Sequence, residues 1–155
     1  MGRTATGVKG ITLDEETGDD CVIGMVCIGR PDAQLLVISE NGYGKRSPID
    51  EYRVTNRGAK GVGTLKVTEK VGALVGILQA SDADDLMVIN RSGIVLRTPV
   101  QAISVIGRNT QGVRIIKLRA GDSISSVMTV LRDETETVDE LSEVVAVDPT
   151  PEAAE

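Results

Sequence analysis

Residues 35–67 read LLVISENGYGKRSPIDEYRVTNRGAKGVGTLKV, and a similar stretch returns 51 positions later, in residues 86–118. The two stretches are identical at 11 of 33 aligned positions, whereas unrelated sequences would match at about two. A shorter third copy opens the chain, because Arg3–Val8 (RTATGV) resembles both Arg57–Val62 (RGAKGV) and Arg108–Val113 (RNTQGV). The chain is therefore built from repeats of about 51 residues.

Each copy consists of short apolar runs separated by turns. Ala73–Leu78, Leu86–Ile89 and Ile94–Arg97 are rich in Val, Ile and Leu, and Gly, Asn or Asp residues lie between them. The pair Asn41-Gly42 is a strong signal for a β-hairpin turn. No segment before residue 133 sustains the apolar period of a helix. The pattern predicts an all-β fold with about four antiparallel strands per repeat, the size of one blade of a propeller.

Composition argues against most enzyme classes. The 155 residues include no His, Trp or Phe, so the chain offers no Ser–His or Cys–His nucleophile pair and no imidazole metal ligand. Cys21 and Cys27 are too widely spaced for a redox or zinc pair, and we expect them to be buried on one strand over residues 22–28. The acidic residues of Asp82–Asp85 are expected to form a solvated turn. We therefore predict a non-catalytic chain that needs no metal or cofactor.

The sequence also lacks the signals of membrane insertion and secretion. No apolar run approaches the roughly 20 residues that cross a bilayer. The N-terminal residues Met1–Thr4 do not resemble a signal peptide. We expect no membrane association and a cytoplasmic location.

Charge is distributed unevenly along the chain. Residues 1–132 contain all 17 basic residues and 14 of the 23 acidic ones. Residues 133–155 contain the other nine acidic residues and no basic one. We therefore divide the chain into a folded body, residues 1–132, and an acidic tail, residues 133–155, which we expect to be disordered.

Basic residues recur at fixed places in the repeat. An arginine follows each hairpin turn, and another lies four residues before each Gly-Val pair. Blades around one axis place equivalent residues on one rim, so recurrence predicts a curved positive track suited to phosphates. The alternative is that each arginine ties down the carbonyls of a nearby loop. The candidate phosphate contacts are Arg3, Lys45, Arg46, Arg57, Lys60, Lys66, Arg97, Arg108 and Lys117.

Two motifs resemble a known family. Asn41–Arg46 (NGYGKR) and Ile103–Val113 (ISVIGRNTQGV) are similar to the C-terminal DNA-wrapping domain of the DNA gyrase A subunit. The resemblance runs from about Arg3 to Val130, and an acidic tail is also typical of that family. It implies a β-pinwheel, in which neighbouring blades exchange strands and duplex DNA bends around the outer rim. Partners implied are double-stranded DNA, the rest of gyrase A and the gyrase B subunit.

The chain departs from the family pattern in two ways. The family's glutamine-arginine-arginine-glycine-glycine-lysine-glycine box is absent, and Arg57–Gly61 is only a weaker equivalent. Three repeat starts also make up about half of a ring, so we expect a C-terminal fragment that forms an incomplete ring. Neither Tyr43 nor Tyr52 lies in a motif like that of the catalytic tyrosine, so the resemblance implies no strand cleavage by this segment.

The resemblance implies that the domain wraps duplex DNA and thereby supports negative supercoiling by the parent topoisomerase. Two alternatives remain open. One is the C-terminal domain of topoisomerase IV, whose repeats are usually more degenerate. The other is a propeller that binds proteins, as in regulators of the chromosome-condensation type.

Overall fold

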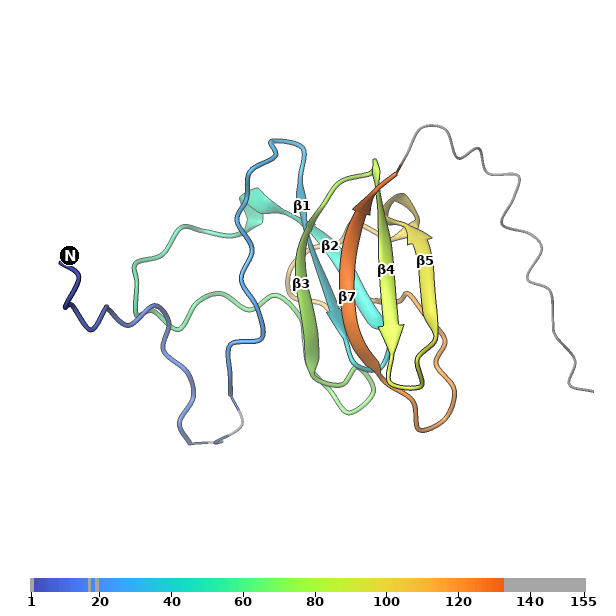
Figure 1. Ribbon diagram of the computed structural model, residues 1–155, viewed down its shortest axis with the longest axis horizontal. Helices are drawn as coiled ribbons and strands as arrows, with labels where there is room; N and C mark the ends of the chain where they lie inside the picture. The colour runs from blue at the N-terminus through green and yellow to red at the C-terminus, as the bar shows by residue number, and fades with distance from the viewer. Residues whose placement is uncertain (1, 17, 19, 133–155) are drawn as a thin grey trace, which may run out of the picture.

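The structure is a computed structural model that describes residues 2–16, 18 and 20–132 (Figure 1). The expected all-β architecture is confirmed. Its only helical elements among the described residues are two short 3-10 helices, Ile49–Glu51 and Val100–Ala102. Neither the length nor the hydropathy of any helix in the described part of the chain would let it span a bilayer. The strands are β1 Gln34–Ser39, β2 Tyr43–Pro48, β3 Leu74–Ala80, β4 Asp84–Asn90, β5 Val95–Pro99, β6 Val113–Arg114 and β7 Ile124–Leu131.

The first sheet has the strand order β3-β1-β2-β6. Its centre is the predicted hairpin, in which β1 and β2 pair antiparallel with Leu36 opposite Arg46. Gly42 in the turn has a φ of +81°, a conformation that glycine adopts without the steric cost of a side chain. The four strands are the number expected for one blade.

The first sheet is completed by a strand from the next repeat. Although β6 belongs to the second copy of the repeat, it pairs with β2 of the first copy, with Gly44 opposite Val113. The approach is close, because a Cβ on Gly112 would lie 2.6 Å from the carbonyl oxygen of Gly44. The strand exchange implied by the family resemblance is therefore present. Residues 103–118 are called the exchanged segment below.

The second sheet has the order β5-β4-β7. The hairpin of β4 and β5 repeats the first one, with Met87 opposite Arg97. In the described part of the chain this sheet has three strands, and no segment takes the place that β6 has in the first sheet.

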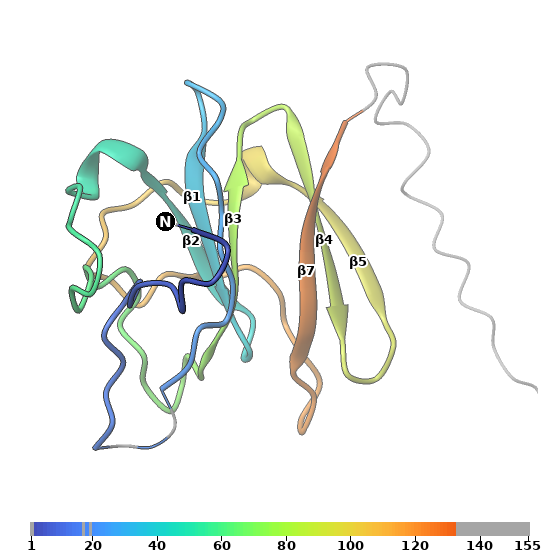
Figure 2. The same ribbon diagram turned by 60° about the vertical axis from the view of Figure 1, so that its left-hand side comes forward.

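The two sheets pack face to face with β3 against β7 (Figures 1 and 2). Gly76 permits this contact, because a Cβ at that position would overlap the side chain of Val127. The core is aliphatic, as the near absence of aromatic residues requires. A Val, Leu or Ile side chain contributes about 1.5–3 kcal/mol when it is fully buried. The core residues are Leu36, Ile38, Ala80, Leu86, Val88, Val100, Ile103 and Ile124.

The N-terminal part differs from the sequence prediction. Residues 22–28 form no strand, and both Cys21 and Cys27 are exposed. By the repeat offset this segment corresponds to β3, which forms by pairing with β1. The described residues contain no β1-type strand for it to join, so the expected burial of the two cysteines is wrong.

Candidate nucleic-acid interface

Lys45 and Arg46 lie in the interior. The side chain of Lys45 is fully buried and donates hydrogen bonds to the carbonyl oxygens of Gly107 and Arg108. Burial lowers the pKa of Lys45, and the nearby positive charge of Arg108 lowers it further, while Glu51 opposes both effects. An ammonium in this position holds backbone carbonyls and does not reach the surface.

Arg46 has a similar structural position. Its Nε donates a 2.8 Å hydrogen bond to the carbonyl oxygen of Ile103, and its Nη1 lies 2.5 Å from a carboxylate oxygen of Asp82. Beside it, the hydroxyl of Ser47 donates to the carbonyl oxygen of Ile106. Together with Lys45, these side chains of β2 fix the exchanged segment in place. We therefore leave Lys45 and Arg46 out of the candidate surface.

The Asp82–Asp85 segment is only partly the solvated turn that the sequence suggested. Asp84 and Asp85 are buried, with 1% and 7% exposure. Asp84 accepts hydrogen bonds from Arg30, which hold the pKa of this carboxyl below its usual value. Burial raises the pKa of Asp85, but hydrogen bonds from Arg132 and Arg97 outweigh this effect and lower it. These carboxylates are structural anchors for arginines.

Arg97 shares the buried carboxylate of Asp85. Its Nε lies 2.7 Å from one oxygen, while Arg132 binds the other oxygen at 2.7 Å. About a third of the Arg97 side chain is exposed. The two arginines that follow the hairpin turns therefore both bind aspartates near the β3–β4 turn, which is a structural reason for their recurrence.

The remaining predicted residues lie nearer the surface. Arg108 is half-buried, with its guanidinium carbon 5.7 Å from the ring centre of Tyr52. Its Nη1 donates to the carbonyl oxygen of Gly63 at 3.3 Å. The other exposed members of the predicted set, besides Arg97, are Arg3, Arg57, Lys60, Lys66 and Lys117.

A basic hollow of about 350 Å³ lies beside Tyr43. It forms where β2 meets the end of the exchanged segment and the turn that leads into β7. We call it the Tyr43 hollow. Four cationic side chains and one anionic side chain line it, a balance that suits an anion such as a phosphate. Its charged lining residues are Lys70, Arg114, Lys117, Arg119 and Asp122.

Tyr43 anchors two of these cations. Arg114 donates a 2.8 Å hydrogen bond to the Tyr43 hydroxyl, and its guanidinium carbon lies 5.4 Å from the ring centre. The ammonium of Lys70 lies 5.5 Å from the same centre. The hydrogen bond from Arg114 lowers the pKa of Tyr43; burial opposes the shift, and the two positive charges reinforce it.

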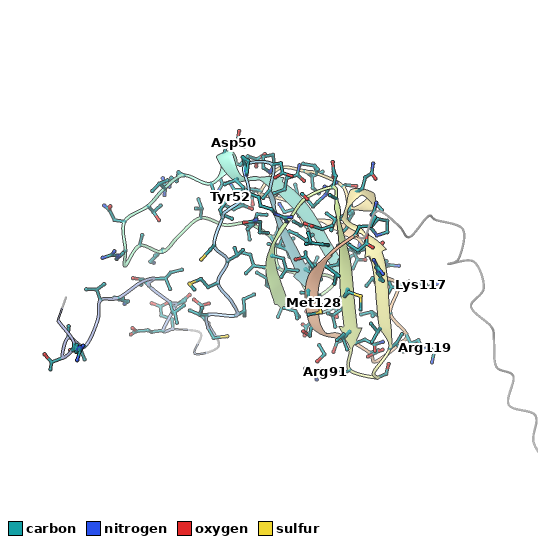
Figure 3. The ribbon with its side chains drawn as sticks, turned by 45° about the horizontal axis from the view of Figure 1, so that its top comes forward. Asp50, Tyr52, Arg91, Lys117, Arg119 and Met128 are labelled. Carbon is teal, nitrogen blue, oxygen red and sulfur yellow. The ribbon has the colours of Figure 1, made fainter. Side chains whose placement is uncertain are left out.

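The surface cations therefore occupy at least two places. Figure 3 shows Lys117 and Arg119 at one edge of the sheets, well away from Asp50 and Tyr52. Arg108, which lies over Tyr52, is thus distant from the Tyr43 hollow. One continuous track through all nine predicted residues is not what the geometry shows, because Lys45 and Arg46 are interior.

Three residues of the Tyr43 hollow did not follow from the repeat. At the 51-residue offset, Lys70 corresponds to Gly121, Arg114 to Gly63 and Arg119 to Thr68. A search for recurring cations cannot find residues that occur once. Only the local density of Lys and Arg in residues 114–119, RIIKLR, could have marked them. Among the described residues, no three His, Cys, Asp or Glu side chains gather in a way that could hold a metal ion.

The architecture and the strand exchange define a protein class, the propeller-like domains whose repeats share strands between blades. A sequence profile described as "DNA gyrase C-terminal domain, beta-propeller" matches residues 1–27, 33–81 and 84–130. The chain belongs to this family.

Curated relatives agree with the profile. The chain is 44% identical over 135 residues, 86% of its length, to the DNA gyrase A protein of Staphylococcus epidermidis. It is 42% identical over all 155 residues to the DNA gyrase A protein of Staphylococcus aureus. The matched parts make up only 15% and 17% of those proteins, so the chain spans less than a fifth of their length.

Solved structures show the same fold. A DNA gyrase A C-terminal domain superimposes with a TM-score of 0.61 and 30% identity, covering 66% of this chain and 35% of that one. The C-terminal domain of DNA topoisomerase IV superimposes with a TM-score of 0.72 at 21% identity, covering 81% of this chain and 38% of that one. At that identity the second likeness establishes fold alone.

Proposed function

We propose that the chain is a non-catalytic module of a gyrase A protein that binds and bends duplex DNA. In the parent topoisomerase, with the rest of gyrase A and with gyrase B, such bending presents a neighbouring DNA segment for strand passage and supports negative supercoiling. Family membership supports the gyrase assignment over topoisomerase IV, because relatives at 42–44% identity are gyrase A proteins.

The observation that carries DNA binding is the Tyr43 hollow. Arg114, Lys117 and Arg119 present three cations from six consecutive residues, and Lys70 adds a fourth from a neighbouring turn. Arginine and lysine side chains of this kind bind phosphate oxygens by charge-assisted hydrogen bonds. Contacts to phosphates position a duplex without reading its sequence, so we expect weak sequence preference.

Bending opposes binding energetically. A smooth bend of 40–90° over a site of 20–30 base pairs costs roughly 1–6 kcal/mol, which phosphate contacts must offset. The exposed residues Arg3, Arg57, Lys60 and Lys66, together with half-buried Arg108, are proposed as a further set of contacts, and none of them lines the Tyr43 hollow. Two separated basic regions on one small body are the arrangement that a bent duplex needs.

The test combines affinity with geometry. Linear duplex DNA labelled at both ends with a fluorescent donor and acceptor is titrated with the chain at several salt concentrations. The proposal predicts binding that weakens steeply with salt and increased energy transfer between the ends. If the chain binds without any change in energy transfer, it is a DNA-binding module that does not bend DNA, and the bending part of the proposal is wrong. Salt-insensitive behaviour or no binding would favour the protein-interaction alternative.

A further inference from the structure

The hydroxyl of Tyr43 uses only part of its hydrogen-bonding capacity. A phenol oxygen can accept hydrogen bonds, and it carries one proton that it can donate. The Tyr43 hydroxyl accepts a 2.8 Å hydrogen bond from Nη2 of Arg114. A guanidinium has no acceptor atom, so Arg114 cannot take the phenol proton in return. Within the described residues, the hydrogen bonds and charges around this hydroxyl come from Arg114 and Lys70, and both are cations.

The one carboxylate that lines the Tyr43 hollow is already engaged. It belongs to Asp122. Its Oδ2 accepts hydrogen bonds from the side chains of Asn90 and Ser92, and its Oδ1 accepts one from the backbone N–H of Ser123. These contacts tie Asp122 to the turns on either side of it. The proton of the Tyr43 hydroxyl is therefore left for solvent or for a ligand.

The hydroxyl lies at the wall of the hollow in a fixed position. Tyr43 is only 8% exposed, yet both it and Arg114 line the hollow. Its backbone is held from two sides, because Tyr43 pairs with Arg114 in the sheet and its carbonyl oxygen accepts a 3.0 Å hydrogen bond from the hydroxyl of Ser39. A nearly buried polar group with an unused proton, facing a cationic hollow, suits a ligand that supplies an oxygen acceptor.

The turns that carry the neighbouring cations are held by other side chains. Nδ2 of Asn41 donates to the carbonyl oxygens of Glu69 and Lys70, at 3.1 and 3.3 Å, and so fixes the turn that presents Lys70. The backbone N–H of Asp122 donates to the carbonyl oxygen of Arg119 at 3.1 Å, which closes the turn beyond Arg119. An anion would therefore enter a site whose groups are largely in place, and this lowers the cost of ordering them.

The two cations also make the phenol a stronger hydrogen-bond donor. The hydrogen bond from Arg114 lowers the pKa of Tyr43; burial opposes the shift, and the charges of Arg114 and Lys70 reinforce it. A more acidic hydroxyl donates a stronger hydrogen bond, and bonds to an ionised acceptor are roughly twice as strong as neutral ones. A phosphodiester fits this donor, because its non-bridging oxygens carry negative charge and no proton.

We propose that the Tyr43 hydroxyl is itself a phosphate ligand, which accepts a hydrogen bond from Arg114 and donates its proton to a non-bridging oxygen of the DNA backbone. This inference rests on the proposed function of the Tyr43 hollow. Ionisation of the phenol would remove the donor and add a negative charge beside the phosphate, so affinity for DNA should fall as pH rises through the pKa of Tyr43. The other charged groups of the hollow are Lys70, Arg114, Lys117, Arg119 and Asp122.

Two phenylalanine variants of the full chain separate the two tyrosines. Affinity for a linear duplex is measured by fluorescence anisotropy at several salt concentrations. Tyr43→Phe keeps the ring and removes the hydroxyl, so binding at neutral pH should weaken about tenfold. The salt slope should stay the same, because no charge is lost. Tyr52→Phe is the matched control, since the Tyr52 hydroxyl contacts Thr64 and Tyr52 does not line the hollow. It should bind like the unaltered chain.

A fluorinated tyrosine tests the direction of the hydrogen bond. In the Tyr52→Phe chain Tyr43 is the one remaining tyrosine, so 3-fluorotyrosine supplied during expression replaces Tyr43 alone. The fluorinated phenol is more acidic, which makes it a better donor and a poorer acceptor. At a pH well below its pKa it should bind DNA more tightly than the Tyr52→Phe chain, and its affinity should fall at a lower pH. Tyr43→Phe retains the lysines of the hollow and should lack this fall between neutral pH and about pH 9.5.

The outcomes separate this inference from the proposed function. Equal affinities of Tyr43→Phe and the unaltered chain at neutral pH would overturn the role of the hydroxyl and leave DNA binding by the hollow intact. Weaker binding by the fluorinated chain at low pH would also overturn it, because the hydroxyl would then act only as the acceptor that anchors Arg114. If the unaltered chain binds no duplex, the proposed function is wrong, and this inference is wrong with it.

Discussion

Arg114 donates a 2.8 Å hydrogen bond to the hydroxyl of Tyr43. Tyr43 begins β2 of the first repeat copy, and Arg114 ends β6 of the second, directly opposite it in the sheet. The pair therefore joins two copies of the repeat at the place where the Tyr43 hollow opens. A contact that stabilises the strand exchange thus also positions a cation for an anionic ligand.

Titration of Tyr43 tests this contact. Because the hydrogen bond from Arg114 favours the phenolate, the pKa of Tyr43 lies below its usual value near 10. Tyr43 and Tyr52 are the two tyrosines of the chain, so a Tyr52→Phe variant isolates the ultraviolet signal of the Tyr43 phenolate. Its midpoint should fall below that of a free tyrosine. Adding Arg114→Ala should move the midpoint upward, and an unchanged midpoint would mean that the contact does not form in solution.

Removing Arg46 should destabilise the fold. The Arg46→Ala change leaves the carbonyl oxygen of Ile103 without its 2.8 Å donor in a buried place. We expect a loss of about 2–3 kcal/mol in the free energy of unfolding, measured by urea denaturation. Arg97→Ala serves as comparison and should cost less, because Arg132 still binds Asp85. Equal losses would contradict the distinct structural roles assigned to the two arginines.

Acid should destabilise the chain through Asp84 and Asp85. Both carboxyls have pKa values lowered in the folded state, so their stabilising effect is present above the unfolded pKa near 3.9. It is lost as pH falls through the lower folded values. Asp84→Asn should reduce the free energy of unfolding at neutral pH and flatten its decline in acid. A decline as steep as that of the unaltered chain would assign the acid sensitivity to other groups.

The acidic tail, residues 133–155, lies outside the described residues, and its predicted disorder remains a prediction. The tail contains nine acidic residues, whereas residues 1–132 have an excess of three positive charges. A flexible tether of this length reaches roughly 25 Å, enough to cover a nearby basic surface. We predict that truncation after Arg132 raises DNA affinity at low salt and has little effect at moderate salt. Equal affinities of both forms at low salt would show that the tail does not compete with DNA.

The repeat made the architecture predictable from sequence. The hairpin at Asn41-Gly42 and the apolar runs near β3, β4 and β5 appear close to their predicted places, because short aliphatic runs between turns depend on local sequence. The predicted strand over residues 22–28 does not form, because a strand also needs a neighbouring strand to pair with. The sequence of that segment alone does not reveal whether such a neighbour is present.

The site was less predictable than the fold. The recurrence of arginine in the repeat singled out Arg46 and Arg97 as phosphate contacts. A recurring arginine can also have a structural role, and both of these bind aspartates near the β3–β4 turn. A buried lysine such as Lys45 cannot be told from an exposed one by repeat position. The sequence did not show that Arg114 and Arg119 share one site with Tyr43, because that proximity depends on the pairing of β6 with β2.

The salt dependence of DNA binding by charge variants of the Tyr43 hollow tests the central claim most directly. Lys117→Gln and Arg119→Gln should each lower the slope of log affinity against log salt by about 0.9, and the double variant by about 1.8, on any duplex sequence. Arg53→Gln, at an exposed position outside the hollow, is the charge-matched control and should leave the slope unchanged. If the double variant and the control bind DNA with the slope of the unaltered chain, the Tyr43 hollow is not a phosphate-binding surface.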